Sequence, residues 1–210
     1  TWQAAEMGYS PLNYDLPASF SDFVISAFAD KIADKYEQVI WGGVNGNAGE
    51  FDGFCPLLLA DGGVDVAATP VTAANVIAEL QKVTAAIPAA IYNKEDLHIY
   101  VGSAIYRFYV QALGVVGAGS GIENKGTLWF NGTPLTADGV KIFYSPGMPA
   151  NSMVAAEVSN LFFGCGLESD FNEIRLIDMA EIDGSQNVRF IQRWKAGIQY
   201  GIREDIILYQ

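Results

Sequence analysis

The longest pattern in this chain is a run of hydrophobic residues at helical spacing between residues 20 and 41. The run consists of Phe20, Phe23, Val24, Ala27, Phe28, Ile32, Tyr36, Val39 and Ile40. Charged and polar residues, among them Asp30 and Lys31, take the opposite face. Ser19 is a favourable first cap and Gly42-Gly43 a favourable stop. The pattern predicts one long amphipathic helix from Phe20 to Trp41.

The same periodicity predicts two further helices. A stripe that Pro88 ends is made of Val76, Ile77, Leu80, Val83 and Ile87. It indicates a second helix over about residues 73–87. Ser103 can cap a third helix that continues through Leu113.

Strands are predicted where hydrophobic residues alternate or form short runs. These segments are Leu97–Val101, Leu128–Phe130, Val140–Tyr144 and Met153–Phe163. Near the end of the chain one parity holds Val188, Phe190, Trp194, Ala196, Ile198, Tyr200 and Ile202, and the other holds Arg189, Arg193, Lys195 and Gln199. This alternation predicts one long strand from Val188 to Ile202 with one buried face, preceded by a turn at Asp183-Gly184. Helices with short strands followed mostly by strands indicate an α+β fold.

A glycine-rich segment, residues 114–126, follows the third predicted helix. It contains Gly117-Ala118-Gly119-Ser120-Gly121. A phosphate-binding turn should follow a strand and open a helix, and this segment follows a helix instead. A mobile loop is therefore the favoured interpretation.

Composition narrows the classes of function. The net charge is −12 and the isoelectric point about 4.3, which argues against a non-specific grip on nucleic acid. No apolar run approaches the roughly 18 residues that a membrane span needs, and no signal-peptide pattern is present. The chain begins at Thr1 without an initiator methionine, as expected of a processed product or part of a longer chain.

The candidate catalytic groups are few. Cys55 and Cys165 are far apart and show no paired spacing, so free, buried thiols are favoured over a disulfide. The single histidine, His98, falls inside a predicted strand, where a structural role is commoner than a catalytic one. Pairing of either cysteine with His98 in a small hydrolase stays open as an alternative. No metal or cofactor site is predicted.

Acidic residues near the predicted terminal hairpin can set its register. Asp178 and Glu181 could pair across the strands with Arg189, Arg193 or Lys195. We expect such pairs to align the hairpin rather than to act as an acid and a base.

The order of these features resembles tailed-phage major capsid proteins with the Hong Kong 97-like fold. The long helix carries Glu37 and ends in Ile40-Trp41-Gly42-Gly43, and the following loop closes with Glu50-Phe51-Asp52-Gly53-Phe54. Later stretches that resemble the family are Leu97–Ser103, Leu128-Trp129-Phe130-Asn131-Gly132-Thr133-Pro134-Leu135, Gly147-Met148-Pro149 and Arg193–Tyr200. The fold-motif residues are Glu37, Gly42, Gly53, Gly132, Pro134 and Gly197. Encapsulin-like shell proteins share this fold.

The resemblance implies a domain plan and a structural role. It implies an arm or linker over 1–19, a peripheral domain with a spine helix packed on a sheet over 20–96, an axial domain over 97–180, and closing strands over 181–210. Subunits would self-associate into hexamers and pentamers, with an axial loop that contains Gly114, Gly117, Gly119, Gly121 and Gly126. The shell would be made in the bacterial host cytoplasm, would enclose DNA without specific binding, and would work with scaffolding and portal proteins. A nanocompartment shell that holds protein cargo is the alternative within the fold.

Overall fold

The structure is a computed structural model that describes residues 18–119, 135–166, 174–179, 182, 184, 185, 187–192 and 195–210. The chain forms two compact units. The first combines residues 1–34 with 166–195, and the second combines 35–165 with 196–210. Each unit is therefore built from two separate stretches of sequence.

Three of the four described helices were predicted. Helix α2 (Ala18–Gly42) extends the predicted 20–41 segment slightly at each end. Helix α4 (Val76–Ala86) starts later than the predicted residue 73. Residues 72–75 form a hydrogen-bonded turn that leads into the helix: Asn75 Oδ1 accepts from the Thr72 amide at 2.7 Å and from the Thr72 hydroxyl at 3.1 Å, and the Val76 amide donates to the Thr72 carbonyl at 3.0 Å.

Helix α3 (Phe54–Gly62) was not predicted. It carries Pro56 in its first turn, which a helix tolerates there, and it ends before Gly63 at φ 76°. These signals were present in the sequence. The helix is only nine residues long, and its three buried residues give too short a stripe for a clear period.

A five-stranded sheet forms the centre of the second unit. Its strands are β1 (Leu97–Val101), β2 (Thr136–Ala137), β3 (Val140–Tyr144), β4 (Met153–Glu157) and β9 (Ile207–Tyr209), in the order β2-β3-β1-β4-β9. The pair β1–β3 is parallel, and the other pairs are antiparallel. Helices with a mixed, mostly antiparallel sheet confirm the α+β class.

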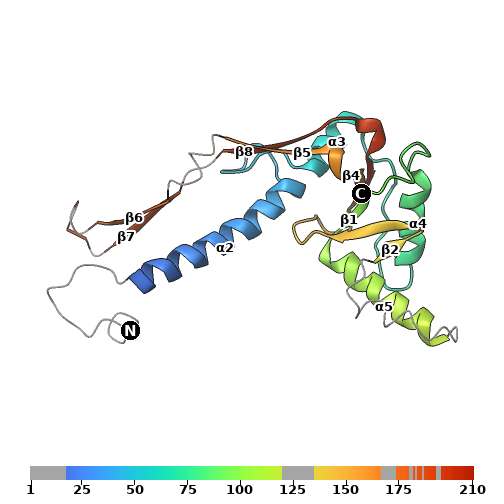
Figure 1. Ribbon diagram of the computed structural model, residues 1–210, viewed down its shortest axis with the longest axis horizontal. Coiled ribbons are helices and arrows are strands. Elements are labelled where there is room, and N and C mark those ends of the chain that lie inside the picture. Colours follow the sequence, from blue (N-terminus) through green and yellow to red (C-terminus); the bar gives the residue numbers. More distant parts are fainter. Residues whose placement is uncertain are drawn as a thin grey trace. The chain divides into compact units, whose positions relative to one another are not determined.

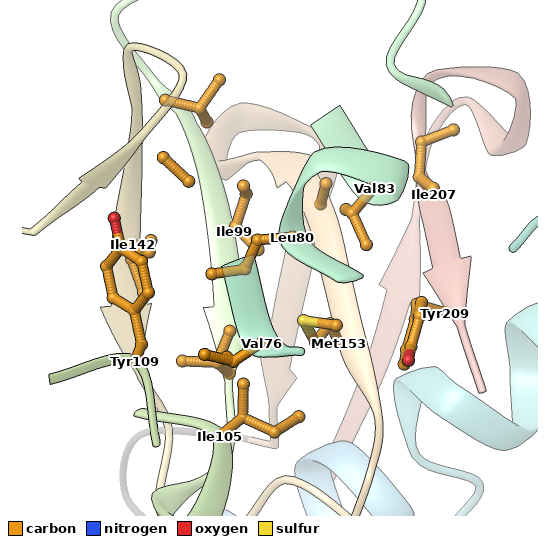
Figure 2. Packing of buried hydrophobic residues seen from close by; sticks show 14 of the residues in the cluster. Val76, Leu80, Val83, Ile99, Ile105, Tyr109, Ile142, Met153, Ile207 and Tyr209 are labelled. Carbon is orange, nitrogen blue, oxygen red and sulfur yellow. The ribbon is translucent and has the colours of Figure 1, made fainter. Parts of the chain in front are cut away.

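Both faces of this sheet are covered by hydrophobic residues. On one face, Val76, Leu80 and Val83 of α4 lie over Ile99, Ile142 and Met153 (Figure 2). On the other face, Trp41, Phe54 and Leu58 pack against Tyr100, Val154 and Leu208. Since alternate residues of β4 enter opposite clusters, that strand is buried along its whole length. The sheet therefore lies at the centre of the hydrophobic core of the second unit.

The predicted strand Met153–Phe163 is wrong as a single element. It is divided into β4 and β5 (Leu161–Cys165) by the short 3-10 helix η1 (Val158–Asn160). The two strands belong to different sheets, because β4 pairs with β1 and β9 whereas β5 pairs with β8 (Ala196–Tyr200).

The predicted strand Val188–Ile202 is also divided. Its described parts are β7 (Val188–Gln192) and β8, and Ile202 lies just before the 3-10 helix η3 (Arg203–Asp205). Strand β7 pairs with β6 (Ile174–Asp178), so two separate two-stranded ribbons result (Figure 1). Alternation fixes which side a residue takes but not which strand lies beside it. The predicted turn is confirmed at Gly184, with φ 72°.

The glycine-rich segment begins later than predicted. Helix α5 (Ser103–Gly119) continues six residues past Leu113, so Gly114, Gly117 and Gly119 are helical rather than in a loop. A glycine costs only about 1 kcal/mol in a helix, and Val115, Val116 and Ala118 between these glycines can continue the helical hydrogen bonding. The remaining predicted loop glycines, Gly121 and Gly126, lie outside the described residues, as do residues 1–17 and 128–134.

Candidate assembly surfaces

Three glycines bring the end of α2 close to two loops, and we name them the glycine junction: Gly43, Gly53 and Gly147. A Cβ on Gly147 would overlap the main chain of Glu37, and one on Gly53 would lie 2.7 Å from the Trp41 carbonyl carbon. The Gly53 amide donates to the Gly43 carbonyl at 2.9 Å. Only residues without a side chain allow this backbone contact. The junction fixes where α2 leaves the body of the second unit.

Glu37, which the family resemblance singled out, holds Trp41 at the same place. The Trp41 indole nitrogen donates to Glu37 Oε1 at 3.2 Å. The indole packs 5.5 Å from the Phe54 ring and 5.0 Å from the Tyr100 ring, measured between centroids. Gly42 also lies at this end, where a Cβ would be 2.9 Å from Pro149 Cγ. Glu37, Gly42 and Gly53 are therefore brought together by the fold.

The loop after α2 is held by one carboxylate. Glu50 accepts from Lys35 Nζ at 2.5 Å, from Asn47 Nδ2 at 3.0 Å and from the Val44 amide at 3.3 Å. The hydrogen bond from Lys35, with those from Asn47 and Val44, lowers the pKa of Glu50 to about 2. Most of this loop is exposed although its ends are fixed. It is therefore a preformed surface feature rather than a loose connection.

Arg203 ties the C-terminal strand to the loop after α3. Its guanidinium donates to the Ile206 carbonyl at 2.7 Å, the Gly63 carbonyl at 3.1 Å and Asp65 Oδ2 at 3.0 Å. Asp65 Oδ2 also accepts from the Leu208 amide at 2.8 Å. Such charge-assisted bonds are among the stronger ones in proteins. The segment from η3 to β9 is thereby fixed against the body of the second unit.

Two aromatic side chains of the β5–β8 ribbon are exposed. Phe162 is 54% exposed and Phe163 52% exposed. Successive residues of a strand point to opposite faces, so the two rings lie on different sides of the ribbon. Phe163 contacts the Tyr36 ring of α2, with 6.5 Å between centroids. Exposed aromatic residues of this kind are typical of surfaces that become buried on association.

The cysteines and the histidine do not form a catalytic pair at Cys55. Cys55 is buried, its nearest polar partner is Met148 Sδ at 3.8 Å, and burial raises its pKa to about 12. His98 Nδ1 lies 2.7 Å from the Asp96 carbonyl, within the structural frame of β1. Cys165 was expected to be buried, but it is exposed on β5, because that ribbon has only two strands. A thiol at Cys55 is thus held protonated.

The remaining predicted residues are scattered. Gly197 lies on β8, with nothing within 4 Å of a built Cβ, so no close contact requires glycine there. Gly132 and Pro134 fall outside the described residues. The sequence reasoning missed Arg203, Lys35 and Glu50 as structural groups. An isolated charge carries no local pattern, since its partner lies 15 residues away for Lys35 and more than 130 for Arg203.

No cluster of three or more potential metal-binding side chains occurs in the described ranges. Within the same ranges, every helix is too short or too polar to cross a bilayer.

Solved structures of phage particles share this fold. The chain matches, over 92% of its length, 64% of a chain in the satellite phage P4 procapsid including size determination (Sid) protein, with a TM-score of 0.60 and 12% identity. It matches 63% of a chain of Mycobacterium phage Che8 over 92% of its own length, with a TM-score of 0.55 and 11% identity. A virus-like particle from Pyrococcus furiosus gives a TM-score of 0.44 at 12% identity, over 73% of this chain and 58% of that one.

No family model and no curated protein matches the chain. It spans slightly under two thirds of each of the two phage chains. Identities of 12% and 11% with TM-scores above 0.5 indicate a shared fold rather than a shared detailed function. The resemblance to phage capsid proteins is therefore confirmed at the level of the fold.

Proposed function

We propose that this protein is the shell-forming subunit of a tailed phage or prophage, a major capsid protein of the Hong Kong 97-like type. The observation that carries the proposal is the fold shared with the P4 procapsid chain over 92% of this sequence. The position of Glu37, Gly42 and Gly53 at the end of α2 adds a local reason, since these are fold-motif residues of the resemblance. The role is structural rather than catalytic.

The domain plan belongs to the same proposal. Residues 20–96 form the peripheral domain around α2, residues 97–180 the axial domain, and residues 181–210 the closing strands. Copies associate into hexamers and pentamers in the virion shell, with the segment that contains Gly114, Gly117, Gly119, Gly121 and Gly126 near the local axis. Because the first three of these glycines are helical, α5 would carry that contact up to Gly119. Scaffolding and portal proteins are proposed partners.

The shell would enclose DNA without gripping it. The 24 acidic residues outnumber the 12 basic ones, which leaves a net charge of −12, so the isolated subunit repels phosphate. An acidic wall is compatible with a container whose contents are loaded by other proteins.

Assembly of the chain expressed from its complete gene is the test. We expect light scattering and electron microscopy to show closed particles, and expect residues 1–210 alone to be mostly monomeric in dilute solution. Particles that protect DNA from nuclease support a capsid, whereas particles filled with a protein indicate a nanocompartment. A complete chain that stays monomeric under all assembly conditions overturns the proposal.

The alternative cysteine hydrolase has its own measurement. A thiol reagent should label Cys165 in the native protein and Cys55 only after denaturation, because a buried thiol with a raised pKa is inert. Turnover of an ester substrate that is lost in Cys165→Ser or His98→Ala would contradict the structural role.

A further inference from the structure

One face of the β6–β7 hairpin combines arginines with isoleucines. In the antiparallel register Arg175 lies opposite Ile191, and Ile177 lies opposite Arg189. Directly opposed residues share a face, so these four positions lie together, with the two arginines in diagonal positions. We name these four residues the basic face. Asp178, which was expected to pair with the basic residues, lies opposite Val188 and therefore takes the other face.

Arg189, on the basic face, has no charge partner among the residues that the structure describes. Arg189 is exposed, and among the described residues no hydrogen bond or ion pair reaches its guanidinium. A two-stranded ribbon is only marginally stable in water by itself. The basic face thus favours an acidic and partly apolar partner.

The second unit carries a surface of the opposite kind, at η1 and η3. Three exposed hydrophobic residues lie there: Val158 at 49%, Phe162 at 54% and Ile202 at 55%. Asn160, which lies between Val158 and Phe162 in the chain, binds Ile202: its side chain accepts from the Ile202 amide at 2.7 Å and donates to the Ile202 carbonyl at 2.8 Å. A Cβ on Gly201 would lie 3.4 Å from the Phe162 ring.

Carboxylates surround these hydrophobic residues. Val158 donates its amide to the Asp96 carbonyl at 3.0 Å, and Ser159 donates its hydroxyl to Asp96 Oδ2 at 2.7 Å. Glu204 and Asp205 follow Ile202 directly in η3, and Glu204 is exposed. Two cations lie beside them: Lys94 is paired with Glu157 at 2.6 Å, and Arg203 is paired with Asp65 at 3.0 Å. We name this surface the acidic patch: Val158, Phe162, Ile202, Asp96, Glu204 and Asp205.

We propose that the basic face of one copy binds the acidic patch of a second copy. This inference rests on the proposed function, since it names a contact through which subunits of the shell associate. The two surfaces are complementary in charge, because the arginines would lie against carboxylates. They are also complementary in hydrophobicity, because the isoleucines would pack against Val158, Phe162 and Ile202. A nucleic acid would satisfy only the arginines, since phosphates offer nothing to the isoleucines. The contact joins different surfaces, so it propagates from copy to copy and closes into a ring when the rotation allows.

Charge reversal in the complete chain tests the contact. Arg189→Glu and Glu204→Arg should each raise the concentration needed for particle formation by about tenfold. The double variant should return to nearly the wild-type value, because every contact again joins opposite charges. An equal mixture of the two single variants should also recover. Lys31→Glu and Asp34→Arg, exposed charges on α2, are the matched controls and should change little.

Disulfide trapping separates this contact from the shell function. In a Cys165→Ser background, chains that carry Ile177→Cys should cross-link to chains that carry Ile202→Cys, and the product should be a dimer on a denaturing gel. Particles that form without this cross-link, or single reversals that assemble like wild type, overturn the contact and leave the shell intact. A wild-type chain that forms no particles overturns the proposed function. A single chain that carries both substitutions and closes the disulfide only within itself, so that it runs as a monomer, assigns the two surfaces to one chain and overturns the contact. Loss of DNA binding in Arg189→Glu, without a cross-link, also overturns the contact.

Discussion

At the scale of single residues, Gly147 carries the sharpest constraint. An added Cβ would overlap the main chain of Glu37, and that helical backbone cannot yield as a flexible side chain could. We expect Gly147→Ala to lower the free energy of unfolding by about 1–3 kcal/mol, as overpacking does elsewhere.

Urea denaturation of Gly147→Ala checks this value. Gly197→Ala is the matched control, because nothing lies within 4 Å of a Cβ built there, and it should change stability by less than about 0.5 kcal/mol. Equal effects of the two substitutions would show that backbone contact at the glycine junction is not what the fold requires.

Glu50 gives the chain a defined response to acid. Its pKa is lowered from 4.5 to about 2 by Lys35, Asn47 and Val44. A lowered pKa stabilises the folded state above the unfolded value, so this contribution is fully present above pH 4.5 and disappears as the pH falls towards 2. The stability difference between wild type and Glu50→Gln should therefore shrink over that range.

The test is the difference in urea midpoint between wild type and Glu50→Gln, measured at a series of pH values. Glu95→Gln removes an exposed carboxylate to which no described residue donates a hydrogen bond, and it serves as the control. A difference in urea midpoint between wild type and Glu50→Gln that stays constant down to pH 2 would contradict the assigned hydrogen bonds.

At the scale of elements, Tyr209 joins β9 to α4. Its hydroxyl donates to Glu79 Oε2 at 2.8 Å and accepts from the Thr69 amide at 3.1 Å. Glu79 is buried, and it also accepts from Lys82 Nζ at 2.7 Å. Burial alone would raise the pKa of Glu79, but the hydrogen bonds from Lys82, Tyr209 and Thr69 hold it below its usual value.

Tyr209→Phe should cost about 1–3 kcal/mol of unfolding free energy, because it leaves buried polar groups without a partner. Tyr92→Phe removes a hydroxyl that donates to the Asp138 carbonyl at an exposed position, where water replaces it. Chemical denaturation should therefore show a clearly smaller loss for Tyr92→Phe. A loss of the same size in both variants would mean that burial of Glu79 does not matter.

Some helix and strand limits could be predicted from the sequence pattern, and others could not. Strands β1 and β3 were predicted with their observed limits, because each is a short run bounded by polar residues or turns. The continuous strand predicted from Val188 to Ile202 failed, since β7 and β8 pair with different partners. Helix α5 was predicted from Ser103, but its end was placed too early because glycine was given more weight than helix propagation.

At the scale of the whole molecule, the two kinds of sheet should differ in stability. Strands β1 and β4 are central in a five-stranded sheet and nearly all of their residues are buried. Strands β6 and β7 form a two-stranded ribbon. Amide hydrogen exchange should therefore be slowest in β1 and β4 and much faster in β6 and β7.

Exchange measured by mass spectrometry on dilute, unassembled subunits is the appropriate experiment. On assembly, protection should rise in β6 and β7, because the basic face becomes covered, while β1 and β4 change little. Protection of β6 and β7 that already equals that of β1 in the monomer would contradict the marginal stability of the ribbon.

The sequence by itself determined the helix that became α2, the strands β1 and β3, the α+β class and the resemblance to a phage shell protein. These features depend on local period, on caps and breakers, and on the order of segments, all of which are written along the chain. Glu37, Gly42 and Gly53 were also named from sequence, and the fold brings them together at the end of α2.

Only the tertiary structure decided which strands pair and which charges meet. Lys35 meets Glu50, and Tyr209 meets Glu79 across 130 positions of sequence. The tertiary structure also placed Arg175 and Arg189 on one face of a hairpin, and it brought Val158, Phe162 and Ile202 to another surface. The physical reason is that a hydrogen bond, an ion pair or a shared face depends on distance in space. Periodicity along the chain fixes the side that a residue takes, but not its neighbour.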